Sequence, residues 1–263
     1  MAYYKAMSAK AVEPPVEFYI NQSGAKVVQG KILVPDFVTS IKIDIGLSGN
    51  APQSKVWIDA NPNVLIFGFE PLSMNIKMIS EASSTWPIRL NPKNIGRNIF
   101  IIPVALSSKT LGHKLKMKIT DNDSGSSSLL DSTNLLQSTS EFVPVFKLDD
   151  FIDYIDLERF EFIEYVKIDA QGMDFEVIRG AKKHLSKICF LTAELDLNYF
   201  GTENNGLKLD CFMALRGFLK LGKISVYLLR RVFKLKINVD DPTYLNLRLV
   251  NKVNKNFFIY QKG

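Results

Sequence analysis

The sequence from Ile41 to Pro71 reads IKIDIGLSGNAPQSKVWIDANPNVLIFGFEP, and it decides the expected fold. Apolar residues alternate or run together at its two ends, as they do in the strands of a sheet. A glycine-bearing loop and a short helical segment lie between them. The order is therefore a strand (41–45), a loop (46–50), a helix (53–59), a second strand (64–69) and an acid at position 70. This order is typical of the front half of a nucleoside-binding α/β unit.

The loop and the acid indicate the kind of ligand. Gly46 permits a backbone turn that brings a ligand close to the main chain. Glu70 ends the next strand, where it can accept hydrogen bonds from ribose hydroxyls. The pyrophosphate-binding pattern G-x-G-x-x-G is absent, because Ser48 stands at its second glycine, and no phosphate-binding lysine follows. A sugar site without a pyrophosphate site predicts a nucleoside that lacks phosphates, and S-adenosylmethionine is the obvious candidate.

Composition indicates one large α/β domain with a substantial core, since the chain has 263 residues of which 46% are hydrophobic. Cys189 and Cys211 lie in apolar segments and are expected to be buried thiols, and two histidines are too few to indicate a zinc site. The sequence shows no signal-peptide pattern and no long apolar run. Together with the cysteine usage, this predicts a cytoplasmic protein. The net charge of +6 is mild.

We divide the chain into a lead-in at residues 1–40 and a domain at residues 41–263, which carries a basic segment at about 211–239. In the lead-in, Glu17–Ile20 and Lys26–Val28 flank a turn and predict a capping hairpin. Beyond Glu70 the pattern predicts a helix at residues 74–82, a buried strand at 99–106, an edge strand at 114–119 and a solvated loop at 121–128. A lid over the cofactor is the second interpretation of this loop, which includes Ser127 and Ser128.

A second stretch, from Phe162 to Leu195, repeats the order of strand, turn, helix and strand. Its first strand ends at Asp169, and Gly172 makes the turn. A helix follows whose first turn carries acids, as the helix dipole favours. The next strand, at residues 188–193, ends at Glu194. Alternation of strands and helices through two units predicts a doubly wound, mostly parallel sheet.

These two stretches together resemble the FkbM family of S-adenosylmethionine-dependent methyltransferases. The likeness covers about residues 41–195 and consists of Asp44-x-Gly46, Phe69-Glu70-Pro71, Val104-Ala105-Leu106-Ser107, Lys167-Ile168-Asp169-Ala170-Gln171-Gly172, Val177-Ile178-Arg179-Gly180-Ala181 and Glu194. The chain departs from the family at residues 47–50, where Leu-Ser-Gly-Asn replaces a more usual Ala-Asn-x-Gly. It also has Gln171 where Glu is common.

The resemblance implies a Rossmann-like sheet whose last strand is antiparallel, the class I methyltransferase fold. It implies O-methylation, often of a sugar or natural-product hydroxyl. The residues that match the family motifs, or flank the first one, become the predicted cofactor contacts: Asp44, Gly46, Leu47, Ser48, Asn50, Glu70, Pro71, Ala105 and Leu106. Asp169 and Glu194 become the catalytic candidates.

Asp169 has three interpretations. It can be the base that removes the proton of the acceptor hydroxyl. It can instead be a ligand to a divalent cation such as Mg²⁺, with Glu194 and Asp196 as further oxygen ligands. In the third interpretation it only caps the helix that begins after Gly172. The sequence favours the base slightly over the metal ligand, because only two acids converge.

The basic segment supports a competing hypothesis, because no acid occurs between Asp210 and Asp240. It is either a solvated helix face or, at Lys220–Lys236, a surface helix near the acceptor entrance. In a non-catalytic relative it would hold an acidic glycan, nucleic acid or a membrane surface. For the enzyme we expect a small-molecule or glycan acceptor, no nucleic acid, and peripheral membrane contact at most. A nicotinamide oxidoreductase is a weaker third alternative, and the oligomeric state is open.

Overall fold

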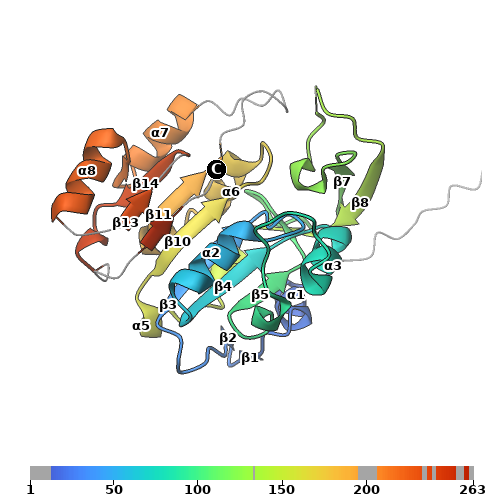
Figure 1. Cartoon of the computed structure of the whole chain (residues 1–263), viewed down its shortest axis with the longest axis horizontal. Coiled ribbons are helices and arrows are strands. Elements are labelled where there is room, and N and C mark those ends of the chain that lie inside the picture. Colours follow the sequence, from blue (N-terminus) through green and yellow to red (C-terminus); the bar gives the residue numbers. More distant parts are fainter. Residues whose placement is uncertain are drawn as a thin grey trace, which may run out of the picture.

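The computed structural model describes residues 13–132, 134–194, 206–232, 236–238, 241–252 and 258–260. A seven-stranded sheet in the order β12-β14-β11-β10-β3-β4-β5 forms its centre (Figure 1). In chain order the strands are β3 (Ser40–Ile45), β4 (Val64–Phe69), β5 (Ile99–Ile102), β10 (Ile163–Ile168), β11 (Ile188–Ala193), β12 (Phe218–Lys220) and β14 (Thr243–Asn246). β14 is antiparallel to both neighbours, whereas the strands from β11 to β5 pair in parallel.

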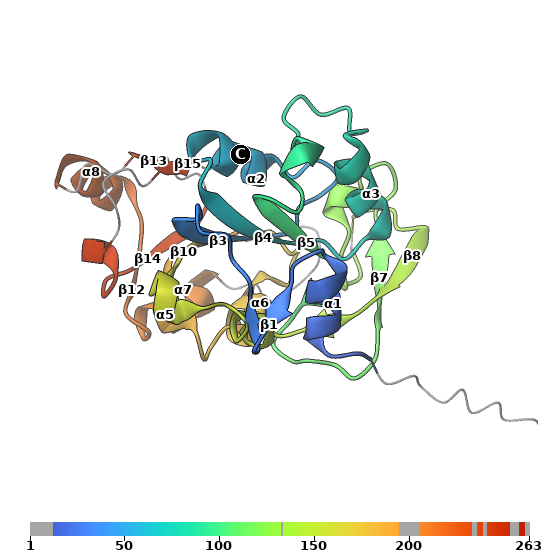
Figure 2. The same ribbon diagram turned by 90° about the horizontal axis from the view of Figure 1, so that it is seen from below.

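Apolar side chains on both faces of the sheet explain why its central strands are continuous apolar runs. In β4, Leu65, Phe67 and Phe69 belong to one buried cluster, and Val64 and Ile66 belong to another on the opposite face. The first cluster receives residues from α1 (Val16–Gln22), α4 (Leu148–Ile152), α6 (Asp174–Gly180) and α7 (Gly206–Ala214). The second receives residues from α2 (Pro52–Ala60), α3 (Ser73–Glu81) and α8 (Lys223–Val232). Figure 2 shows α2 and α3 on one side of the sheet and α1, α6 and α7 on the other.

The strand order reverses beside β3, and this reversal positions the site. From β3 the chain proceeds outward through β4 and β5, whereas β10 and β11 lie on the other side of β3. Ligands of open α/β sheets bind at such a reversal, beyond the carboxyl ends of the strands. The parallel register of β3 and β10 places Asp44 opposite Lys167.

A smaller layer covers this end of the sheet. β6 (Ala105–Leu106) pairs in parallel with β9 (Val145–Phe146), and β7 (Leu115–Ile119) pairs antiparallel with β8 (Thr139–Val143). We call residues 115–143 the flap; Thr133 within it lies outside the described residues. The remaining elements are β1 (Val27–Val28), β2 (Lys31–Ile32), η1 (Pro92–Asn94), η2 (Ser124–Ser126), α5 (Leu157–Phe160), η3 (Leu185–Lys187), β13 (Lys236–Asn238), η4 (Val250–Lys252) and β15 (Phe258–Tyr260).

The lead-in differs from its prediction. The first segment of the predicted hairpin, Glu17–Ile20, is part of the helix α1. The hairpin forms instead between β1 and β2, which follow it in the chain. Val16, Tyr19 and Ile20 are buried in the first cluster. Their spacing of three and four residues is that of one helix face, a period that the strand prediction for Glu17–Ile20 overlooked. Residues 1–12 lie outside the described part of the chain.

Three other expectations need correction. The strand predicted over residues 99–106 divides into β5 and β6, because Pro103 has no backbone N–H to donate to the sheet. Cys211 is exposed, not buried, whereas Cys189 is buried as expected. The segment Lys220–Lys236, expected to be one surface helix, consists of the end of β12, a loop, the helix α8 and the first residue of β13, and residues 233–235 are not described. Among the described helices, none is long and apolar enough to cross a bilayer.

Candidate functional site

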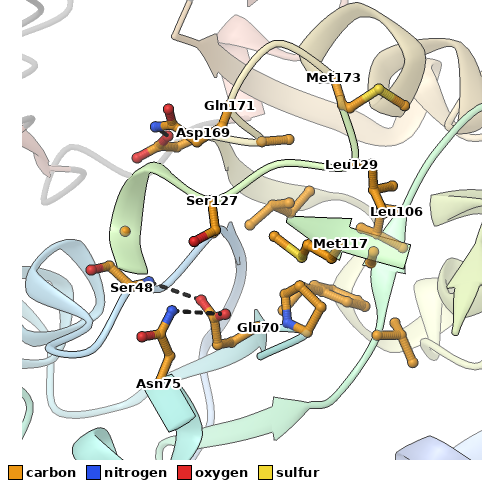
Figure 3. Close-up of a pocket in the computed structure, with 18 of the residues that line it drawn as sticks. Ser48, Glu70, Asn75, Leu106, Met117, Ser127, Leu129, Asp169, Gln171 and Met173 are labelled. Carbon is orange, nitrogen blue, oxygen red and sulfur yellow. Dashed lines mark hydrogen bonds between the residues drawn. The ribbon is translucent and has the colours of Figure 1, made fainter. Parts of the chain in front are cut away.

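A cavity opens where β3, β4 and β10 end, beneath the flap, and its empty space of about 530 Å³ includes space open to solvent (Figure 3). One side is polar, with Ser48, Glu70 and Asp169, and the other is apolar. The predicted site residues in the lining are Gly46, Ser48, Glu70, Pro71, Ala105, Leu106 and Asp169. The structure thus brings together residues that are up to about half the chain apart in sequence.

Glu70 is a buried carboxylate in the cavity wall, with 3% of its surface exposed. Its Oε2 accepts a hydrogen bond from the Ser48 N–H at 3.0 Å, and its Oε1 accepts from the Leu72 N–H and the Asn75 Nδ2, both at 3.1 Å. Burial raises the pKa of Glu70 to about 7, although these bonds act in the opposite direction. A carboxylate has about four lone-pair sites, so one remains for a ligand hydroxyl.

Gly46 is required by the packing of the chain itself. Its φ is +78°, and a Cβ there would lie 1.9 Å from the backbone oxygen of Asp169. The two loops are drawn together because the Asp169 N–H donates to the Ile45 carbonyl at 3.0 Å. The glycine therefore lets the loop after β3 pack directly against the loop after β10.

Three of the predicted cofactor contacts lie behind the cavity wall rather than in it. Asp44 is buried, and the Ser54 hydroxyl donates to its Oδ2 at 2.6 Å. The Leu47 side chain packs in the second apolar cluster. Asn50 donates through Nδ2 to the Ile88 carbonyl at 2.9 Å. These three residues are not among those that line the cavity, so their role as cofactor contacts stays a prediction.

Asp169 is held by two donors at the polar end of the cavity. Lys167 Nζ lies 2.9 Å from Oδ2, and Gln171 Nε2 donates to Oδ1 at 2.8 Å. Lys167 also donates to the Gly46 carbonyl at 3.4 Å, and its side chain is only 14% exposed. Burial acts to lower the pKa of Lys167, but the charges of Asp169 and Asp44 raise it above its usual range. Lys167 is therefore a fixed cation between carboxylates.

Glu194 completes this charged group. It follows β11, and its backbone N–H donates to the Ile168 carbonyl at 3.0 Å. The charge of Asp169 and, second, burial raise the pKa of Glu194 to about 7, while Lys167 opposes the shift. Glu194 lies next to Asp169 but is not part of the cavity lining.

The described residues do not fit a divalent cation at Asp169. Within the described ranges, no group of three or more His, Cys, Asp and Glu side chains is arranged to hold a metal. The Lys167 ammonium lies 2.9 Å from Asp169 Oδ2, where it would repel a second cation. Asp196, the further ligand that the sequence offered, lies outside the described residues.

The flap closes over the cavity and bonds to both of its ends. Ser127 and Ser128 are 3% and 1% exposed, so the prediction of a solvated loop is wrong for them, and the alternative of a cover over the site fits. The Ser124 hydroxyl donates to Asn75 Oδ1 at 2.6 Å. The Ser128 hydroxyl donates to the Gln171 carbonyl at 2.7 Å. Through these contacts the flap supports residues that hold Glu70 and Asp169 in place.

The basic segment does not reach this cavity in the part that is described. No residue of the ranges 206–232 and 241–252 is among the lining residues. Figure 1 shows α8 at the opposite end of the molecule from the flap. The expectation of a basic helix beside the acceptor entrance is therefore not met by these residues.

Sequence reasoning missed two residues that support the site, Lys167 and Asn75. For Lys167 a signal was present, because it stands two residues before Asp169, and residues at that spacing share one face of a strand. Asn75 gave no comparable signal. Its role follows from the fold, since helix α3 brings its side chain to Glu70 and to Ser124 of the flap.

Comparison with known protein families identifies the class to which this fold and site belong. Residues 55–230 match the family model described as the methyltransferase FkbM domain, which is more than half of the chain. The chain therefore belongs to the FkbM methyltransferase family. The mixed α/β architecture with its large mixed sheet is compatible with an α/β methyltransferase fold. Comparisons with curated proteins and with solved structures found no match.

Proposed function

We propose that this methyltransferase transfers the methyl group of S-adenosylmethionine to a hydroxyl, and that the acceptor is a sugar or glycan. The observation that carries the proposal is the cavity. Its wall contains a buried carboxylate, Glu70, and a charged group around Asp169 at the other end. In this proposal Glu70, which accepts bonds from Ser48 and Asn75, also accepts one from the ribose of the cofactor. Ala105, Leu106 and Met117 offer the apolar wall that a purine base needs.

The charged group at the other end suits proton removal from a hydroxyl. S-adenosylmethionine, when bound, supplies an electrophilic methyl group on a sulfonium. Asp169 is the base in this proposal, because its carboxylate lines the cavity and its bonds to Lys167 and Gln171 hold it in position. The hydroxyl proton passes to Asp169, and the adjacent Glu194 can take it on, since its pKa is about 7. Lys167 offsets part of the repulsion between the two carboxyls.

The same proposal includes the finer features that the resemblance implied. We infer that the sheet has the Rossmann-like arrangement of class I methyltransferases and that residues 41–263 form the catalytic domain behind the lead-in. Helix α1 of the lead-in packs in the first apolar cluster, so the two parts share a core. We also keep the prediction of a cytoplasmic location. No step in the proposed reaction uses a metal.

Ligand binding followed by a transfer assay tests this function. S-adenosylhomocysteine should raise the melting temperature, whereas NADH should not, and the reverse result would favour an oxidoreductase. Label from S-adenosylmethionine should then appear on a member of a saccharide panel, with equal rates in Mg²⁺ and in EDTA. Activity that EDTA abolishes and Mg²⁺ restores would refute the metal-free base. Cofactor binding without transfer to any hydroxyl would refute O-methylation.

A further inference from the structure

Helix α8 presents an exposed face on which apolar and basic side chains are mixed. Its inner side is anchored by Leu229, which is 6% exposed and belongs to the second apolar cluster. Tyr227 and Leu228, in contrast, are 54% and 51% exposed. Lys223 and Arg231 are exposed and lie four residues before and after Tyr227, so these three side chains line one side of the helix.

The positive charge of this face is not neutralised within the described part of the chain. The sequence from residue 211 to residue 239 contains seven Lys and Arg residues and no Asp or Glu. Lys220 pairs with Asp210 at 2.9 Å, but in the described ranges no carboxylate pairs with Lys223 or Arg231. Arg231 instead donates to the Tyr227 hydroxyl at 2.6 Å. Among the described residues, the charges of Lys223 and Arg231 are therefore open to a negatively charged partner.

The position of α8 leaves the cavity accessible. The helix follows β12, the outermost strand at one edge of the sheet, and the flap lies beyond the other edge (Figure 1). A partner that covered α8 would therefore lie far from the residues that line the cavity.

We propose that the exposed face of α8 docks this protein on an anionic lipid membrane. Leucine and tyrosine side chains gain free energy when they enter the boundary between headgroups and acyl chains. Flanking lysine and arginine side chains extend toward anionic headgroups, which attract them. The exposed apolar surface of Tyr227 and Leu228 favours a lipid boundary over nucleic acid, because non-specific binding to a phosphate backbone is electrostatic and does not use such side chains. The inference rests on α8 alone and is independent of the proposed methyl transfer.

Vesicle binding tests the proposal directly. The full-length protein should sediment with phosphatidylcholine vesicles that contain about one third phosphatidylglycerol, and not with phosphatidylcholine alone. Added salt should weaken the binding, because it screens exposed charges. Absence of binding to the anionic vesicles, or equal binding to the neutral ones, would overturn the proposal.

Two double variants separate the contributions of charge and apolar contact. Lys223→Glu with Arg231→Glu should weaken binding by about tenfold or more, given the attraction of each basic residue to an anionic leaflet. Tyr227→Ser with Leu228→Ser should also weaken it, because insertion is lost while the charge remains. If the serine variant binds like wild type and the glutamate variant also loses binding to single-stranded DNA, the face is a non-specific anion surface and the membrane proposal fails.

Matched controls come from exposed residues away from α8. Lys26→Glu with Lys93→Glu makes the same change in net charge, and Val28→Ser with Leu33→Ser removes comparable exposed apolar surface. Both should bind anionic vesicles like wild type, and a loss equal to that of the α8 variants would overturn the assignment to α8. An unchanged melting temperature and an unchanged far-UV circular dichroism spectrum in every variant confirm that the fold is intact.

Discussion

Replacing Glu70 by Gln tests the assignment of the ribose site most sharply. Glu70 accepts bonds from Ser48, Leu72 and Asn75, so removal of the whole carboxyl in Glu70→Ala would leave three donors without a partner. Each buried donor left unsatisfied costs about 1–3 kcal/mol. Alanine would therefore destabilise the loop as well as the ligand site. Glutamine keeps the size and one oxygen, which can still accept from Leu72 and Asn75, and it leaves only the Ser48 N–H facing an amide NH2.

The expected loss follows from the bond that Glu70 would make to the ribose. A hydrogen bond to a charged group contributes about 1.5–3 kcal/mol, which corresponds to a roughly 10- to 150-fold weaker affinity when it is lost. The pKa of Glu70 is about 7, so the carboxyl is mostly protonated at lower pH and mostly ionised at higher pH. If the ionised form binds the ribose, wild-type affinity should rise about tenfold between roughly pH 6 and 8. The Gln variant should show no such rise.

Titration calorimetry with S-adenosylhomocysteine across this pH range is the assay. Glu194→Gln is the matched control, because Glu194 also has a pKa of about 7 but lies at the catalytic end. It should keep wild-type affinity and the pH dependence. A Glu70→Gln variant with wild-type affinity at high pH would refute the ribose assignment, and affinity that falls as the pH rises would show that the protonated acid binds the ligand.

Three further perturbations address the rest of the site. Asp169→Asn should lower kcat by about 10²-fold or more with S-adenosylhomocysteine affinity nearly unchanged. Wild-type turnover would refute Asp169 as the base, and it would not make this residue a helix cap, because the N-cap of α6 is Met173 and Asp169 bonds to Lys167 and Gln171. In Lys167→Met the pKa of Glu194 should rise beyond about 7, because a neighbouring cation is lost, so the acid limb of the pH profile of kcat should move to higher pH. Lys167→Arg keeps a cation and should show a smaller shift. If the acid limb does not move in Lys167→Met, the role of Lys167 is packing alone. Gly46→Ala places a methyl group 1.9 Å from the Asp169 carbonyl oxygen and should lower the free energy of unfolding in urea by about 3 kcal/mol or more. Gly24→Ala, at φ +89° in open space, measures the backbone strain alone, and an equal loss in both variants would refute the steric argument.

Local patterns were sufficient for the central sheet. The strand predicted at residues 64–69 has the bounds of β4, and the helix predicted at residues 53–59 lies within α2. Such segments are visible in sequence because an apolar run and a helical period each occupy consecutive residues. The same local logic failed at α1, where a short segment fits a strand and a helix alike. Its burial against the sheet decided between them.

Contacts between segments far apart in sequence were decided only by the tertiary structure. The sequence places Glu70 and Asp169 at strand ends and so predicts that both face one site. It does not show that Lys167 lies opposite Asp44 in the sheet, because that pairing depends on the register of two strands more than one hundred residues apart. Nor does it show that Ser127 and Ser128 are buried, since polar loops are normally solvated and only the folding of the flap over the cavity removes them from water. The sequence by itself thus determined which groups are present at the strand ends, and the packing of distant loops decided which of them touch.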